Sequence, residues 1–157
     1  MRATVIILVA ALAAGVPACN RVRAPDVELT DVKFAGFGLQ GISLSAELSI
    51  ENPNGFAIEA DSISFELEAG NPNQRGAWTR VTSGTSRERL RVEEHDTAKA
   101  AVPIQFAYND LAAPVRAMLN KGTLDYRVRG HVWIRRPLPV PVPFSHTGTV
   151  SISGAGN

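Results

Sequence analysis

The residues with the clearest chemical potential occupy every second position near the carboxyl end of the chain. They are Arg127, Arg129, His131, Trp133 and Arg135. A guanidinium group binds phosphate oxygens through paired hydrogen bonds, and an indole ring is favoured where an apolar layer meets water. Two interpretations stay open: a surface that contacts lipid phosphates, lipopolysaccharide or a glycan, or the ordinary solvent-facing side of one strand.

The other reactive side chains do not combine into a catalytic or metal-binding constellation. His95 and Asp96 are adjacent, and neighbours on a strand point to opposite faces, so the pair makes a poor chelate. The adjacent acids Glu93 and Glu94 are typical of a solvated turn, and His146 is predicted to be partly buried with a backbone partner. No serine lies in a Gly-x-Ser-x-Gly elbow. We therefore expect no enzyme activity, no metal and no cofactor.

The first 18 residues have the outline of a secretory signal peptide. Arg2 precedes an uncharged apolar run that ends close to the single cysteine, Cys19. This run is shorter than the roughly 20 residues that an apolar helix needs to cross a bilayer. The sequence therefore predicts that residues 1–18 are removed rather than kept as a permanent span.

Residues 16–19 (Val-Pro-Ala-Cys) resemble a bacterial lipobox. The resemblance implies a thioether-linked lipid on Cys19 and an acyl group on its new amino terminus, and two or more acyl chains anchor a protein stably. Residues 19–25 would then be a lipidated tether. Asn20 is not the aspartate that commonly retains lipoproteins at the inner membrane, so by analogy we expect the outer membrane, facing the periplasm. The alternative is a lone cysteine inside an ordinary signal peptide.

The charge balance gives no reason to expect nucleic acid as a partner. The full chain has 16 Lys plus Arg and 15 Asp plus Glu, and residues 1–18 hold one of the arginines and no acid. The expected mature chain is therefore neutral and generates no overall field that attracts a polyanion. Its length fits one monomeric domain with a stable core, predicted at residues 26–153, followed by a tail at 154–157.

Alternation of apolar and polar residues predicts strands throughout the mature chain. The strongest runs extend from Ile42 to Glu51, from Ala98 to Phe106 and from Thr123 to Arg135. Weaker strands are expected at 27–34, 78–82, 88–92 and 147–153. Proline at every second position from 137 to 143 removes amide donors on one side, which predicts a sheet edge or a polyproline-like stretch. Pro103 is likewise expected at an edge or a bulge.

A turn signal follows the first of the strong strands and suits a type I turn. Its residues, predicted to be structural, are Asn52, Pro53, Asn54 and Gly55. We predict a β-hairpin in which the strand from Ile42 to Glu51 pairs with one that starts at Phe56, and we expect Gly55→Val to destabilise it. The apolar phase of the second strand changes near Asp61, which predicts a β-bulge.

A single short helix is predicted from Asp110 to Lys121, where apolar residues recur at helical spacing and Gly122 follows as a left-handed terminus. About seven antiparallel strands joined by Gly- and Pro-containing turns favour an all-β fold over an α/β layout. The expected architecture is an immunoglobulin-like or fibronectin III-like β-sandwich with one short helix.

Five segments carry a family resemblance. They are residues 48–56 (Leu-Ser-Ile-Glu-Asn-Pro-Asn-Gly-Phe), the following strand to Gly70, residues 102–104 (Val-Pro-Ile), 124–130 (Leu-Asp-Tyr-Arg-Val-Arg-Gly) and 143–144 (Pro-Phe). In this order they resemble the late embryogenesis abundant type 2 family, also called the water-stress and hypersensitive-response domain. The resemblance implies a sandwich without a cofactor, no agreed catalytic residues, and an association with desiccation and stress protection. The loop from Asn71 to Arg75 looks longer than is usual for this family.

Two function hypotheses follow from these observations. The first is a lipid-anchored, non-enzymatic envelope protein with a stress-associated β-sandwich, whose partner is the membrane through the acyl chains on Cys19. The second is a periplasmic binding module or carrier for a lipid or another hydrophobic or anionic ligand, held between the sheets or on the arginine-rich face. An envelope protein is a further expected partner.

Overall fold

A computed structural model describes residues 22–71, 74–112, 116, 120 and 122–151. The predicted signal peptide, Cys19 and the tail at 154–157 lie outside these residues. The described chain forms eight strands and one 3-10 helix. In chain order they are β1 (Asp26–Phe37), β2 (Gly41–Glu51), β3 (Ile58–Gly70), β4 (Trp78–Ser86), β5 (Leu90–Val92), β6 (Thr97–Ala107), η1 (Tyr108–Asp110), β7 (Thr123–Arg136) and β8 (Val140–Ser151).

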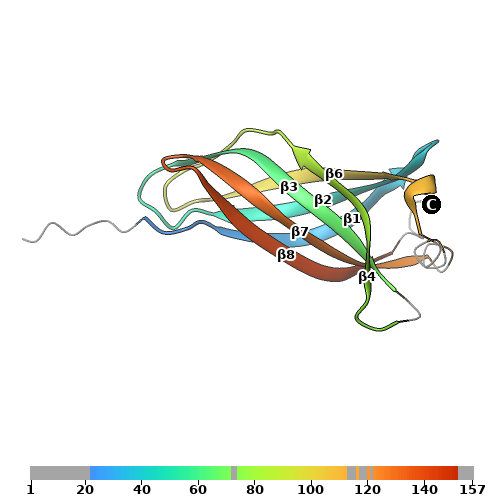
Figure 1. The fold of residues 1–157 in the computed structure, drawn as a ribbon. Helices are drawn as coiled ribbons and strands as arrows, with labels where there is room; N and C mark the ends of the chain where they lie inside the picture. The colour runs from blue at the N-terminus through green and yellow to red at the C-terminus, as the bar shows by residue number, and fades with distance from the viewer. Residues whose placement is uncertain (1–21, 72–73, 113–115, 117–119, 121, 152–157) are drawn as a thin grey trace, which may run out of the picture.

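The strands form two sheets packed face to face (Figure 1). One sheet has the order β1-β2-β6, and the other has the order β4-β3-β7-β8, with β5 paired to β3 beyond the end of β4. Each pairing is antiparallel. β1 and β8 lie next to each other and bring one edge of each sheet together. The predicted all-β, antiparallel sandwich is confirmed.

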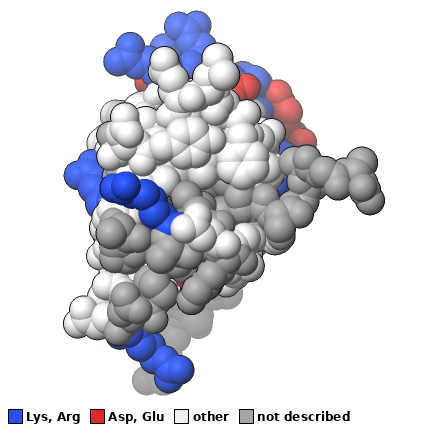
Figure 2. Space-filling model, turned by 90° about the vertical axis from the view of Figure 1, so that its right-hand side faces the viewer, with Lys and Arg blue, Asp and Glu red and all other residues white. Residues whose placement is uncertain are grey.

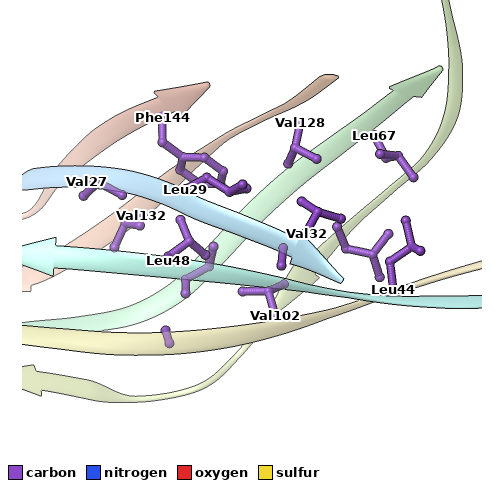
Figure 3. Close-up of a cluster of buried hydrophobic side chains, with 14 of the residues drawn as sticks. Val27, Leu29, Val32, Leu44, Leu48, Leu67, Val102, Val128, Val132 and Phe144 are labelled. Atoms are coloured by element: carbon purple, nitrogen blue, oxygen red, sulfur yellow. The ribbon is translucent and has the colours of Figure 1, made fainter. Parts of the chain in front are cut away.

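Alternation along the strands places one set of side chains between the sheets. On β2, each even-numbered residue from Ile42 to Ile50 is buried. Figure 3 shows side chains from both sheets meeting in this interior, including Leu48 from β2, Val128 from β7 and Phe144 from β8. Burial of one such side chain contributes about 1.5–3 kcal/mol. The sandwich is therefore stabilised chiefly by a continuous apolar core.

The predicted hairpin between β2 and β3 is wrong. β2 pairs with β1 on one side and with β6 on the other, whereas β3 pairs with β4, β5 and β7. Residues 52–57 therefore carry the chain from one sheet to the other. The alternating pattern of β2 predicts a strand, but it carries no information about which strands pair with it. Here β1 and β6 occupy both edges of β2, so β3 cannot pair with it.

Gly55 is also less constrained than a tight turn would require. Among the described glycines, positive φ angles occur at Gly36, Gly76 and Gly122, and not at Gly55. A Cβ added at Gly55 would lie 3.6 Å from His95 Nε2, which is an ordinary contact. The geometric basis for a large effect of Gly55→Val is therefore absent.

Several other local predictions are confirmed. β3 has an irregular register on either side of Asp61, because Ala60 and Ser62 pair with consecutive residues of β7. Pro103 lies on β6, and Pro141 and Pro143 lie at the start of β8, whereas Pro137 and Pro139 lie between β7 and β8; β6 and β8 are both sheet edges. Proline fits an edge because its missing amide leaves no ladder hydrogen bond unmade. Gly122 has a left-handed φ of 76°.

Two predicted segments fall partly outside the described residues. Most of the helix expected from Asp110 to Lys121 is one of them, although Arg116 N donates to Ala112 O at 3.1 Å. Part of the loop from Asn71 to Arg75 is the other. The loop is closed at its base, because Asn71 N donates to Ala77 O at 2.9 Å.

Candidate functional surface

The five alternate residues predicted as a ligand or membrane surface all belong to β7, and their side chains lie on its outward face. The inward side chains of the same strand are buried, namely Leu124, Tyr126, Val128, Val132 and Ile134. β7 is an inner strand of its sheet, flanked by β3 and β8. The environment of its outward side chains is therefore determined by what these two strands place beside them.

The first half of this face, here named the paired half, consists of Arg127 and Arg129. In the β3–β7 register they lie opposite Glu68 and Glu66. Arg127 Nε donates to Glu68 Oε2 at 2.6 Å, and Arg129 Nη2 lies 3.1 Å from Glu68 Oε1 and 3.2 Å from Glu66 Oε1. Arg80 on β4 approaches Glu66 at 3.5 Å. Opposite charges in facing positions stabilise an antiparallel ladder.

Glu68 is the only charged residue that is buried in the described part of the chain, with 7% of its surface exposed. The hydrogen bond from Arg127 lowers the pKa of Glu68 below its ordinary value, and the charge of Arg129 acts in the same direction while burial opposes it. The Arg127 guanidinium carbon also lies 4.7 Å from the centroid of the Trp78 ring, a cation–π distance. Arg127 is therefore committed to contacts within the protein.

The second half of the face, here named the tip half, consists of Trp133, Arg135 and Arg136 beside the β7–β8 turn. Here Arg135 Nη2 and Arg136 Nε lie 3.4 Å and 3.8 Å from one carboxylate oxygen, Glu59 Oε2. Arg91 on β5 approaches the other oxygen of Glu59 at 3.5 Å. Because Arg91 is paired more closely with Glu93, at 2.6 Å, Glu59 is shared chiefly by Arg135 and Arg136, and the tip half has an excess of positive charge.

The residues that β3 places opposite β7 account for this difference between the halves. Glu68 and Glu66 lie on the outward face of β3. At the next two outward positions of β3, Ser64 lies opposite His131 and Ser62 lies opposite Trp133. Asp61 on β3 and Arg135 on β7 have no partner in the register, and Glu59 then lies opposite Arg136. No carboxylate of β3 therefore lies directly opposite Trp133.

The tip half is also the more apolar part of this face. Trp133 is 45% exposed, Leu138 in the turn is 60% exposed and Val140 at the start of β8 is 39% exposed. The His131 ring lies beside Trp133 with 6.4 Å between centroids. Residues 137–151 contain no Lys, Arg, Asp or Glu. The surface next to the tip arginines is therefore uncharged.

The residues predicted as a structural turn form a buried polar cluster instead of a tight hairpin. Asn52 Nδ2 donates to Phe56 O at 2.7 Å and to Glu93 O at 2.9 Å, while Asn52 N donates to Asp96 O. Asn52 Oδ1 accepts from the backbone and side-chain nitrogens of Asn54. Both asparagines are buried. The corner thus ties the β2–β3 connection to the loop between β5 and β6.

Asn54 extends this cluster to the entering chain. Its Oδ1 accepts from Arg23 N at 2.8 Å, and its Nδ2 donates to Arg23 O at 2.9 Å. These paired hydrogen bonds mimic one step of a β-ladder and hold the segment before β1 against the corner. The point at which the chain enters the sandwich is therefore fixed.

The opposite end of the sandwich carries little charge. Figure 2 shows this end with uncharged residues over much of its upper part, with Lys or Arg side chains around them and Asp or Glu side chains at the upper margin. Phe37 and Leu39 at the β1–β2 turn and Tyr108 after β6 are exposed. A groove of about 450 Å³ is lined there by uncharged residues, among them Gln40 and Thr82.

Sequence reasoning missed the residues that distinguish the two halves of the β7 face. Glu66 and Glu68 alternate in the sequence in the same way as the arginines, and this spacing was a usable signal for a charged outer face. Trp78 and the shared role of Glu59 had no such signal. Among the described residues, no group of three or more His, Cys, Asp or Glu side chains is placed to hold a metal ion.

The fold and the open strand face define the class of this protein: an antiparallel β-sandwich with its candidate site on the outer surface of one sheet. The family model for late embryogenesis abundant protein (LEA_2) matches residues 47–148, and the chain belongs to this family. A search of curated proteins finds no match.

Solved structures support the same fold. A solution structure of an Arabidopsis thaliana protein is 18% identical, has a TM-score of 0.67, and is matched over 88% of each chain. A solution structure of a protein assigned to the late embryogenesis abundant class is 23% identical with a TM-score of 0.61, over 83% of this chain and 72% of that one. A crystal structure of an Archaeoglobus fulgidus protein is 11% identical and has a TM-score of 0.58, over 82% of this chain and 97% of that one. No helix in the described chain is long and apolar enough to span a membrane.

Proposed function

We propose that this protein is a lipid-anchored, non-enzymatic domain of the cell envelope that protects its surroundings during water loss. The family association with stress gives the general role, and Cys19 gives the anchor. The observation that carries the proposal is the pair of hydrogen bonds between Asn54 and Arg23. They hold Arg23, four residues after Cys19, against the sandwich, so an anchor on Cys19 would determine which end of the domain lies near the membrane.

The paired half of β7 supports a role that must persist when water is withdrawn. The Coulomb attraction between two charges rises as the dielectric constant of their surroundings falls. The pairs formed by Arg127 and Arg129 with Glu68 and Glu66 are already in place in the hydrated protein. Drying therefore strengthens contacts that stabilise the native sandwich, and the domain stays folded.

The anchor is tested by metabolic labelling with a clickable fatty acid in cells that express the full chain. We expect label on the wild-type protein and none on Cys19→Ala, which should leave the membrane fraction. Cys19→Ser is a second variant that preserves the size of the side chain. Equal labelling of the variants and the wild type contradicts lipidation at this residue.

The protective role is tested in a deletion strain exposed to drying and to osmotic upshift. We expect survival to fall in the deletion strain and to be restored by the wild-type gene but not by Cys19→Ala. Unaltered survival under both stresses contradicts the protective role and leaves the labelling result unaffected.

The second candidate is a binding module for a hydrophobic ligand. The groove of about 450 Å³ at the uncharged end, next to Phe37 and Leu39, favours this alternative because it combines a hollow with exposed apolar side chains. Native mass spectrometry of the purified protein distinguishes the two candidates. A carrier retains a lipid, and Leu39→Asp reduces the retained fraction, whereas a protective scaffold shows only the protein mass.

A further inference from the structure

We propose that the tip half of β7, together with the β7–β8 turn, rests on the headgroups of an anionic phospholipid bilayer. This inference deepens the proposed anchoring and rests on it, because the lipid on Cys19 would hold the domain beside that bilayer. It assigns the contact to Trp133, Arg135, Arg136 and Leu138 and excludes Arg127 and Arg129.

The position of the tip fits this role. β7 ends and β8 begins at the end of the sandwich where β1 starts, and β1 and β8 are neighbours (Figure 1). Asn54 holds Arg23 at that same end. Only four residue steps separate Cys19 from Arg23, a reach of about 14 Å when extended. An anchor on Cys19 therefore keeps this end of the domain close to the headgroups.

The distribution of charge selects the edge that faces the bilayer. Arg135 and Arg136 share Glu59 with Arg91, so the β7–β8 edge carries excess positive charge. Other acids at this end lie outside the β7–β8 turn: Asp26 and Glu51 are at the ends of β1 and β2 in the other sheet, and Glu93, Glu94 and Asp96 are in the loop after β5, on the side of β3 away from β7 and β8. An anionic surface is therefore attracted to the β7–β8 turn rather than to these acidic segments.

The apolar residues of the tip match the chemistry of a membrane interface. Trp133, Leu138 and Val140 are exposed next to the two arginines. Indole rings are enriched at the headgroup level, and guanidinium groups bind phosphates in the bidentate manner. Leu138 lies at the turn, where it can enter the layer without distorting the sheet.

The two tryptophans of the chain provide a direct test, because Trp133 lies in the tip half and Trp78 lies against Arg127 in the paired half. The full chain is purified from membranes as two variants. Trp78→Phe leaves Trp133 as the reporter, and Trp133→Phe leaves Trp78. Each is mixed with vesicles of brominated phosphatidylcholine, with or without phosphatidylglycerol, and quenching of the indole fluorescence is measured.

We expect Trp133 to be quenched at least twofold more strongly than Trp78, and more strongly with phosphatidylglycerol than without it. The double variant Arg135→Gln/Arg136→Gln should lose the effect of phosphatidylglycerol. In the Cys19→Ala protein, which lacks the anchor, the same double variant should lower partitioning into anionic vesicles roughly 30-fold. The charge-matched control is Arg75→Gln/Lys99→Gln, whose residues lie on the β3–β4 loop and on β6. It should behave as the wild type.

The outcomes separate this inference from the proposed anchoring. A lipidated protein in which Trp133 and Trp78 are quenched equally, or neither is quenched, overturns the docking surface but not the anchor. Absence of lipid on Cys19 together with phosphatidylglycerol-dependent quenching of Trp133 overturns the anchor and supports the docking surface. Leu138→Asp, a change at an exposed turn, should reduce the quenching of Trp133 without altering thermal stability, and unchanged quenching contradicts insertion of the turn.

Discussion

The paired half and the tip half of β7 belong to one strand and both carry arginines, but their surroundings differ. Arg127 and Arg129 face two glutamates of β3, one of which is buried, and Arg127 packs against Trp78. Arg135 and Arg136 share Glu59 and adjoin exposed apolar residues. The same residue type therefore pairs with a buried carboxylate in one half and is largely exposed in the other.

This contrast shows that the role of an arginine on a strand depends on the neighbouring strand. An ion pair of two exposed side chains contributes little, whereas a pair with a buried carboxylate is costly to break because the remaining charge is left without its partner. The boundary between the halves lies where β3 presents serine instead of glutamate and then bulges at Asp61. Four variants test the contrast, from the largest expected effect to the smallest.

Gly130→Ala should disrupt both halves, because Gly130 lies between them. A Cβ at this position would lie 2.0 Å from Ser64 O on β3 and 2.6 Å from the Phe144 ring on β8. The backbone must shift to accommodate it, and we expect a loss of about 3 kcal/mol in the free energy of unfolding. Urea denaturation followed by circular dichroism measures this loss.

Gly55→Ala is the matched control, since its Cβ would meet only an ordinary contact at 3.6 Å. It should change the free energy of unfolding by less than about 0.5 kcal/mol. If Gly130→Ala and Gly55→Ala lowered the free energy of unfolding equally, the close approach of β3 and β7 would not be what excludes a side chain at Gly130.

Glu68→Gln should destabilise the protein through the paired half alone. The neutral amide keeps the shape of the side chain but removes the charge that Arg127 and Arg129 share. We expect a loss of about 1–2 kcal/mol, because hydrogen bonds to charged groups contribute about that much. Thermal melts at neutral pH measure it. Stability equal to the wild type would show that the pair contributes nothing beyond packing.

The stability of the wild type should depend more steeply on acid pH than that of Glu68→Gln. The pKa of Glu68 in the folded protein lies below its ordinary value of 4.5. The stabilisation from this group is therefore complete above about pH 4.5 and is lost as the pH falls through the lower, folded-state pKa. Melts between neutral pH and pH 3 should converge for the two proteins, and parallel curves would contradict the assignment.

Glu59→Gln should have the smallest effect on stability and a distinct effect on the tip half. Its partners Arg91, Arg135 and Arg136 are all exposed, so we expect a change of less than about 0.5 kcal/mol. Removal of this carboxylate increases the positive charge of the tip. Sedimentation with phosphatidylglycerol vesicles should therefore show tighter binding for Glu59→Gln than for the wild type. The gain in vesicle binding should be smaller for Glu68→Gln than for Glu59→Gln.

Much of the fold could be predicted from local patterns. The alternation in β2, β6 and β7 predicted both the strands and their buried faces, and the change of phase near Asp61 predicted the bulge. The pairing of β2 with β3 was predicted wrongly, because a turn motif between two strands is compatible with a hairpin and with a crossing between sheets. The burial of Asn52 and Asn54 follows from the crossing and has no signature in the motif itself.

The sequence predicted that these five residues share one face of a strand, but it did not predict the difference between the paired half and the tip half. Arg127, Arg129, His131, Trp133 and Arg135 share the outward face of β7, as the period of two requires. Their environments differ because residues about 60 positions earlier in the chain, on β3, lie opposite them, as in the pairs Glu68–Arg127 and Glu66–Arg129.

Side-chain direction on a strand repeats every two residues, so the sequence alone specifies which residues of each strand face the core and which face solvent. It also specifies the proline-blocked edges and the cysteine expected to carry the anchor. The partners of each strand depend on contacts between distant segments, and only the assembled sheets establish them. The packing of β3 against β7 thus leaves Arg127 half-buried in an ion pair and Arg135 at an exposed tip, although both belong to one alternating sequence pattern.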